Sequence, residues 1–125
     1  MKKLTIILSI FILVSCSYQA NDELTIYTSR QPQLLEPIIE DFFQDTGIKV
    51  NLLSGNAQEL MERIDIEGEN SPADIFMTVD AGVLWQATER KIFSETNSDI
   101  LKKNIPEYLR DPSNQWFGFS KRART

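Results

Sequence analysis

The chain has 125 residues, of which 42% are hydrophobic and 25% charged, and its formal net charge is −5. The length allows one globular domain, because domains commonly contain about 100–150 residues. The acidic balance argues against nucleic acid as a partner, since phosphate binding needs clustered Lys and Arg. The sequence has no histidine and one cysteine, which excludes a histidine-ligated zinc site, a Ser-His-Asp triad and an internal disulfide.

The N-terminus is typical of an export signal followed by a tether. Two lysines precede an apolar run over 4–14, which is too short to span a membrane and has the length of a signal-peptide core. The run ends in Leu-Val-Ser-Cys, which resembles a bacterial lipobox. This predicts a lipoprotein signal peptide over 1–15, lipidation of Cys16, a polar tether over 16–22 and an extracytoplasmic, membrane-tethered protein. Ordinary secretion with an incidental cysteine is the alternative.

The chain then alternates strand and helix. Segments rich in β-forming and apolar residues predict three strands, at 23–28, 48–53 and 73–79. Apolar residues at helical spacing predict a helix after each strand: one from about 34 to a C-cap at Gly47, one around 60–64, and one from an N-cap at Asp80 to about Lys91. This order favours an α/β fold, with a mostly parallel sheet and helices on both faces.

The pattern weakens after Ile92. A short helix is expected at 99–104, and Pro106 and Pro112 mark a loop. The segment QWFGFS at 115–120 predicts a further strand, which leads into a basic end of the chain.

Polar loops follow all three expected strands, at 28–31, 54–56 and 80–82. Ligands of open α/β sheets bind at the carboxyl ends of the strands, and helix N-termini there suit anions. Arg30 carries the one positive charge of the first loop, and it is equally consistent with a solvated surface arginine. Asp80 fits a helix cap better than a ligand.

Two enzyme-like or signalling alternatives fit poorly. Asp80 at the end of a strand would suit the phosphoacceptor of a signalling receiver, but such a site needs acidic residues after the first strand, where Ser29 and Arg30 stand. A hydrolase would need a histidine, a GxSxG motif or paired carboxylates at the strand ends, and the sequence offers none of them. A non-enzymatic binding protein is therefore favoured.

Five segments carry a resemblance to a known family. They are TSRQP (28–32), DTGIKVNLLSG (45–55), GENSPADIFMTVDAG (68–82), LKKNIP (101–106) and RDPSNQWFGFSKRAR (110–124). Together they resemble the ferric-iron-binding family of ABC-transporter solute-binding proteins. The resemblance implies that 23–125 is the incomplete N-terminal lobe of a periplasmic-binding-protein-like (class II) fold, truncated before the second lobe.

The resemblance also implies a function. The protein would act as a monomer without a cofactor, capturing ferric iron, with an anion such as carbonate, for delivery to an ABC-transporter permease. Another solute, an oxyanion or thiamine, and a non-functional truncated remnant are the alternatives.

The resemblance further implies that the metal ligands are tyrosines of the second lobe, so that none is expected in this fragment. The first-lobe ligands of some relatives, a histidine matching Gln31, a tyrosine matching Ser29 or a glutamate matching Val79, are replaced here. The candidates that remain for ligand or anion binding are Arg30, Gln31, Arg122 and Arg124. The three tyrosines, Tyr18, Tyr27 and Tyr108, are expected to be structural.

Overall fold

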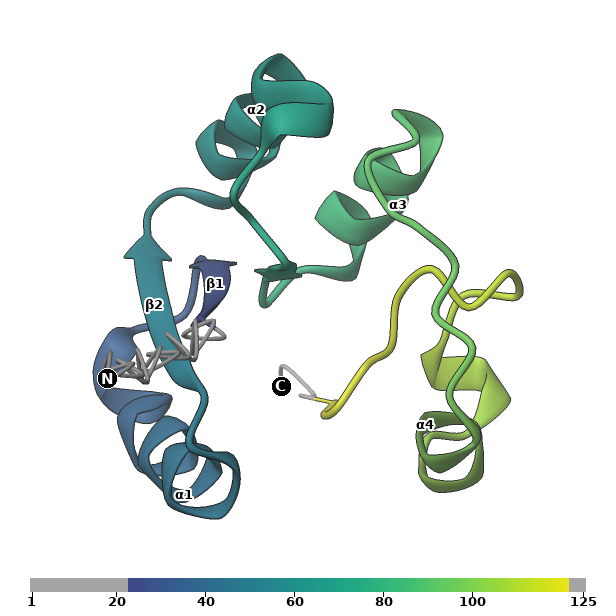
Figure 1. The fold of residues 1–125 in the computed structure, drawn as a ribbon. Coiled ribbons are helices and arrows are strands. Elements are labelled where there is room, and N and C mark those ends of the chain that lie inside the picture. Colours follow the sequence, from purple (N-terminus) through teal and green to yellow (C-terminus); the bar gives the residue numbers. More distant parts are fainter. Residues whose placement is uncertain (1–22, 122–125) are drawn as a thin grey trace, which may run out of the picture.

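A computed structural model of the chain describes residues 23–121, and its centre is a small parallel sheet (Figure 1). The strands are β1 (Glu23–Thr28), β2 (Lys49–Ser54) and β3 (Ile75–Met77), in the order β2-β1-β3. Ile26 of β1 is in register with Leu52 on one side and Ile75 on the other. The predicted parallel pairing of the first three strands is confirmed.

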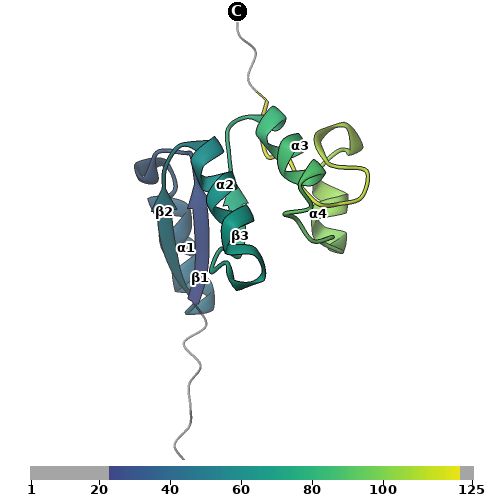
Figure 2. The same cartoon turned by 90° about the horizontal axis from the view of Figure 1, so that it is seen from above.

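Helices cover both faces of this sheet. Helices α1 (Glu36–Thr46) and α2 (Ala57–Glu67) lie against opposite faces, and α3 (Ala81–Glu89) packs beside α2 (Figure 2). The shorter elements are α4 (Asp99–Asn104) and the 3-10 turns η1 (Pro32–Leu34), η2 (Gly68–Asn70) and η3 (Glu107–Leu109). This is the architecture of a periplasmic-binding-protein-like (class II) lobe, of which the chain forms a part.

The core lies on the α2 side of the sheet. One buried cluster joins β1 to α2 through Tyr27, Leu60 and Ile64, and a second joins α2 to α3 through Met61, Val83 and Ala87. Helix α1, by contrast, has no buried residue. The α2–α3 layer therefore fixes the position of the loops at the carboxyl ends of β1 and β3.

The predicted caps at Gly47 and Asp80 are confirmed, whereas the cap at Asn56 was not predicted. Gly47 ends α1 in the left-handed conformation, with φ 72°, where a residue without Cβ is favoured. The side chain of Asn56 accepts hydrogen bonds from the backbone at the start of α2, and Asp80 does the same for α3. The loops after β2 and β3 are therefore each held by the side-chain cap of the following helix.

Two predictions need correction. The third strand is shorter than 73–79, because beyond Met77 the Thr78 hydroxyl accepts hydrogen bonds from Ser29 Oγ and Asp80 N. The segment at 115–120 is not a strand of the sheet. Its backbone bonds go to a neighbouring loop instead, with one isolated antiparallel bridge from Phe117 to Arg110.

The remaining predictions about organisation concern residues outside the described range. The signal peptide at 1–15 and the tether at 16–22 lie in that part of the chain. Within residues 23–121, no helix is both long enough and apolar enough to cross a membrane.

Candidate functional site

The loops after β1, β2 and β3 are joined by hydrogen bonds into one polar edge. The fully buried Thr28 accepts a bond on its carbonyl from Gly55 N, at 3.1 Å, and on its hydroxyl from Arg30 N, at 3.0 Å. Ser29 N donates to Met77 O at 2.9 Å. These bonds cross all three strands, so the backbone that carries Arg30 has a defined position.

The third of these loops places Asp80 as a helix cap. Its carboxylate accepts a hydrogen bond from Gly82 N at 2.7 Å, and its own N–H donates to Thr78 Oγ1 at 3.3 Å. A Cβ at Gly82 would lie 3.1 Å from the Asp80 carboxylate, which is a tight contact. The geometry matches the predicted cap.

A cavity of about 850 Å³ opens at this polar edge. Its lining includes the polar residues Arg30, Thr78, Asp80 and Ser120, together with β3 and several apolar side chains. Arg30 is partly buried there and forms no ion pair with any carboxylate in residues 23–121. A guanidinium that lines a cavity without a carboxylate partner is suited to binding an anion.

The structure brings only part of the predicted set to this cavity. Arg30 lines it, whereas Gln31 is exposed at the start of η1, where its carbonyl accepts a bond from Leu34 N at 3.1 Å. Arg122, Arg124 and Cys16 lie outside the described residues.

Lys121 is the last residue that the structure describes, and it belongs to the basic end of the chain. Its ammonium lies 4.4 Å from the centre of the Tyr108 ring, and Tyr108 lines the same cavity. A cation over an aromatic ring is stabilised by the ring quadrupole. Lys121, the last described residue, therefore lies against a side chain that lines the cavity.

The described residues hold no ready-made metal centre. No group of three or more Asp, Glu, His or Cys side chains in residues 23–121 is placed to bind a metal ion. Of the tyrosines, Tyr108 is 72% exposed, Tyr27 is buried, and Tyr18 lies outside the described part. Phenolate ligation by Tyr27 would require breaking the polar network that holds its hydroxyl.

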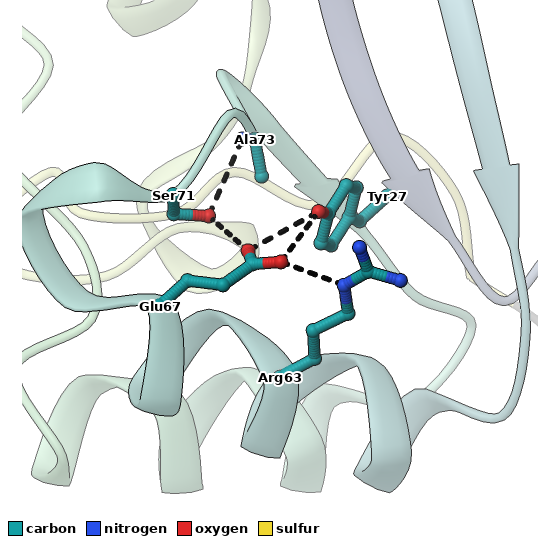
Figure 3. A network of polar contacts seen from close by, with 5 residues as sticks. All are labelled: Tyr27, Arg63, Glu67, Ser71 and Ala73. Carbon is teal, nitrogen blue, oxygen red and sulfur yellow. Dashed lines mark hydrogen bonds and ion pairs between the residues drawn. The ribbon is translucent and has the colours of Figure 1, made fainter.

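That network ties β1 to the end of α2 (Figure 3). The Tyr27 hydroxyl lies 3.1 Å from each carboxylate oxygen of Glu67, and Arg63 Nε and Ser71 Oγ each donate to that carboxylate at 2.7 Å. The Arg63 guanidinium also lies 5.4 Å from the centre of the Tyr27 ring. The expected structural role of Tyr27 is confirmed, but its partners were not predicted.

The surroundings of Tyr27 and Glu67 favour a protonated phenol and a charged carboxylate. Burial, and then the hydrogen bond to Glu67, raise the pKa of Tyr27, so its phenol stays protonated. The hydrogen bonds from Arg63 and Ser71 lower the pKa of Glu67. The one sequence signal for this network was the i, i+4 spacing of Arg63 and Glu67.

Replacing Glu67 by Gln should remove a pH-dependent part of the stability. A lowered pKa means that Glu67 stabilises the fold above its unfolded pKa of about 4.3, and that this stabilisation is lost as the pH falls through the lower folded value. The free energy of unfolding should thus differ most between the Glu67→Gln variant and the parent above about pH 5, and the difference should shrink below about pH 4. Urea unfolding at several pH values measures it.

The matched control for that experiment is Glu69→Gln. Glu69 is exposed on the adjacent turn η2 and makes no side-chain hydrogen bond within the described residues. Its substitution should change the free energy of unfolding equally at all these pH values. A pH-independent effect of Glu67→Gln would contradict the role assigned to the carboxylate.

The fold and the polar edge define the class of protein. The model of the bacterial extracellular solute-binding protein family matches residues 27–125, and the chain belongs to this family.

Two relatives of the chain are named for iron uptake or ferric iron binding. The chain is 52% identical over 102 residues to iron uptake protein A1 of Synechocystis sp., covering 82% of this chain and 28% of that protein. It is 31% identical to the Fe(3+)-binding periplasmic protein of Serratia marcescens, covering 83% and 30%. The chain therefore spans about three tenths of the length of these relatives.

Solved structures show the same relationship. A Trichodesmium protein (IdiA, FutA) in complex with iron and citrate ligands superposes with a TM-score of 0.76 at 47% identity, covering 78% of this chain and 31% of that one. The ferric binding protein from Campylobacter jejuni superposes with a TM-score of 0.73 at 42% identity, covering 75% and 30%. The expected resemblance to the ferric-iron-binding family is confirmed.

Proposed function

We propose that this chain supplies the N-terminal lobe of a substrate-binding component of an ABC transporter for ferric iron. The observation that carries the proposal is the 47% identity and shared fold with a protein solved with iron and citrate. The chain would act without a cofactor and without enzymatic activity, as a monomer that captures iron outside the cytoplasm and delivers it to the permease.

Within this lobe, Arg30 is proposed to face an anion that accompanies the iron. Its place in the cavity lining and its lack of a carboxylate partner in the described residues support this role. Arg122 and Arg124 are proposed to add positive charge from the segment that follows Lys121, with Gln31 as a neighbouring polar group. Carbonate is a suitable anion, because a planar oxyanion can accept two N–H bonds from one guanidinium.

The hard Fe³⁺ ion prefers oxygen ligands, and we propose that these come from polypeptide that the relatives carry beyond the matched region. The absence of an acidic cluster from residues 23–121, and the engagement of the Tyr27 hydroxyl by Glu67, support this assignment. The lobe would then contribute charge and shape to the site, while the metal ligands lie elsewhere.

We further propose that the protein is a lipoprotein. Residues 1–15 would be its signal peptide, Cys16 its lipidated residue, and 16–22 its tether to the membrane surface. The extracellular solute-binding family to which the chain belongs supports an extracytoplasmic location.

Ferric titration tests the proposed division of the site. The 125-residue chain alone should not develop a visible tyrosinate-to-iron charge-transfer band. A chimera in which it replaces the matched stretch of Synechocystis iron uptake protein A1 should develop one. In that chimera, Arg30→Ser should weaken iron binding about tenfold in the presence of carbonate, which is a loss of about 1.4 kcal/mol.

Exposed Arg90 pairs with Asp65 at 3.5 Å and does not line the cavity, so it provides the matched control. Arg90→Ser should leave iron affinity unchanged. A colourless chimera would refute the ferric assignment and favour another solute, or a remnant without binding activity. A coloured 125-residue chain would instead place the ligands within it, with Tyr108 as the first residue to replace by Phe.

A further inference from the structure

Residues 92–98 join α3 to α4 without forming a helix or a strand (Figure 1). Within this connecting segment, Thr96 N donates a hydrogen bond to Asn114 O at 3.0 Å. The next residue is Asn97, and it is exposed. A segment with few backbone hydrogen bonds and exposed side chains opens more readily than a helix or a strand does. Asn97 therefore lies where the main chain is free to change its local geometry.

An asparagine that precedes a small residue is able to react with its own main chain. The backbone nitrogen of the next residue attacks the carbonyl carbon of the side chain and closes a succinimide ring. Because the two groups belong to one short stretch of chain, the attack is intramolecular and is favoured over hydrolysis of an isolated amide. The pair Asn-Ser occurs twice in the sequence, as Asn70-Ser71 and as Asn97-Ser98. The two pairs can therefore be compared within one molecule.

The attacking nitrogen is bonded in the first pair and free in the second. Asn70 belongs to the 3-10 turn η2, and Ser71 N donates to Gly68 O at 3.0 Å. Ser98 N has no acceptor within the described part of the chain. A nitrogen held in a turn must lose its hydrogen bond before it attacks, at the cost of that bond. The backbone thus favours reaction at Asn97.

A lysine ammonium lies against the carbonyl group that is attacked. Lys102 Nζ donates to Asn97 Oδ1 at 2.6 Å, and Lys102 forms no ion pair with a carboxylate of residues 23–121. Because an ammonium group only donates, the amide oxygen must face the lysine and the amide nitrogen must face away. The attack places negative charge on this oxygen, and a cation beside a developing oxyanion lowers the barrier. Asn97 therefore combines a free nucleophile with a polarised carbonyl.

Helix α4 holds the lysine in this position. Ser98 is the N-cap of the helix, with its hydroxyl accepting from Leu101 N at 3.3 Å and its carbonyl accepting from Lys102 N at 3.0 Å. At the other side of the same residue, Arg110 Nη1 donates to Lys102 O at 3.0 Å. The backbone of Lys102 is thus bonded through both its N–H and its C=O, which sets its place relative to Ser98.

We propose that Asn97 is a site of spontaneous modification, at which the chain converts the asparagine to aspartate and isoaspartate. Ser98 N forms a bond to Asn97 Cγ, the Cγ–Nδ2 bond breaks, and ammonia leaves with the proton of Ser98 N. Water then opens the succinimide, giving aspartate by attack at Cγ and isoaspartate by attack at the main-chain carbonyl carbon. The net reaction consumes one water and releases one ammonia. It does not depend on which solute the protein binds.

The modification changes the start of α4. Either product places a carboxylate beside Lys102, where the neutral amide stood. Isoaspartate also adds a carbon atom to the main chain just before Ser98, which displaces the cap of the helix. Thr96 and Leu101, on the two sides of this position, line the cavity. We expect the modified chain to have a less stable α4 and an altered cavity wall.

Peptide mass spectrometry of the full chain tests the proposal. The folded chain is incubated in neutral buffer made with oxygen-18 water, so that each event leaves a labelled oxygen at the modified residue. Asn97 should react at least tenfold faster than Asn70. In denaturing urea the two rates should agree within twofold, because both pairs then have free backbone nitrogens. Equal rates in the folded chain, or a difference that persists in urea, would overturn the proposal.

Two lysine variants test the part played by the ammonium. Lys102→Met should slow the reaction at Asn97 at least threefold and leave Asn70 unaffected. The matched control is Lys103→Met, because the exposed Lys103 makes no side-chain hydrogen bond within the described residues, and it should leave both rates unchanged. An equal or faster reaction in Lys102→Met would overturn the assigned role of the lysine. Circular dichroism checks that both variants fold, and if Lys102→Met does not, the comparison of the two Asn-Ser pairs in the parent chain decides.

Discussion

Replacing Met61 by Ala should lower the free energy of unfolding by about 2–5 kcal/mol, as buried large-to-small substitutions do. Met61 is fully buried, and it packs in one cluster with Val83 and Ala87, which holds α2 against α3. The substitution leaves a cavity between these helices, and part of the loss comes from the packing that cannot relax into it. Urea unfolding followed by circular dichroism measures the change.

Replacing Met61 by Ala should also affect the candidate site. Helix α3 begins at the cap formed by Asp80, and Asp80 lines the cavity and donates its N–H to Thr78 Oγ1. A loosened α2–α3 contact should therefore speed hydrogen exchange at 80–84 as well as lower stability. The control is Ile66→Ala, at a position 87% exposed on α2, which should change the free energy by less than about 0.5 kcal/mol. Equal effects of the two variants would contradict the assignment of the core to the α2–α3 layer.

Local signals in the sequence were sufficient for most of the fold. The strands at 23–28 and 48–53 alternate or concentrate β-forming residues, and the caps at Gly47 and Asp80 follow from the chemistry of single residues. Even the six-residue α4 was predicted with the bounds it has in the structure. These elements depend on neighbours in sequence, and such neighbours are visible without a structure.

The strand predicted at 115–120 is wrong because strand formation depends on residues distant in the sequence. Its composition predicts a strand, but a strand exists only where another edge pairs with it, and here the segment pairs with 109–111 through one bridge. Residues of β3 and of 115–120 line the same cavity, but no backbone hydrogen bond joins the two segments within the described residues. The residues at 115–120 thus predict only a tendency to form a strand. Among the described residues, no strand of the sheet pairs with them.

The site was predictable only in part, for a similar reason. The rule that ligands bind at the carboxyl ends of strands led to Arg30 and to the polar loops. The network of Tyr27 with Glu67 joins residues 40 apart in the chain, and no local pattern connects them. Side chains that meet only through tertiary packing need the fold before they can be assigned.

Replacing Cys16 by Ala should release the protein from the membrane fraction into the soluble extracytoplasmic fraction. The apolar run at 4–14 is too short to serve as a lasting span, and no helix of residues 23–121 could replace it. Under the proposed lipidation, membrane attachment would depend on acyl chains at Cys16, each of which would contribute about 0.8 kcal/mol per buried CH₂ group. Fractionation with immunoblotting, together with labelling by a radioactive fatty acid, measures both attachment and its cause.

The matched control is Ser17→Ala, which changes the neighbouring residue and leaves the thiol in place, and it should leave both fractionation and labelling unchanged. Retention of the Cys16→Ala variant in the membrane would mean that the apolar segment is not removed and anchors the protein itself. Release of the parent protein would mean ordinary secretion. Both results would leave the lobe free to bind its solute. Only the second would remove membrane attachment, and with it a high local concentration near the proposed permease.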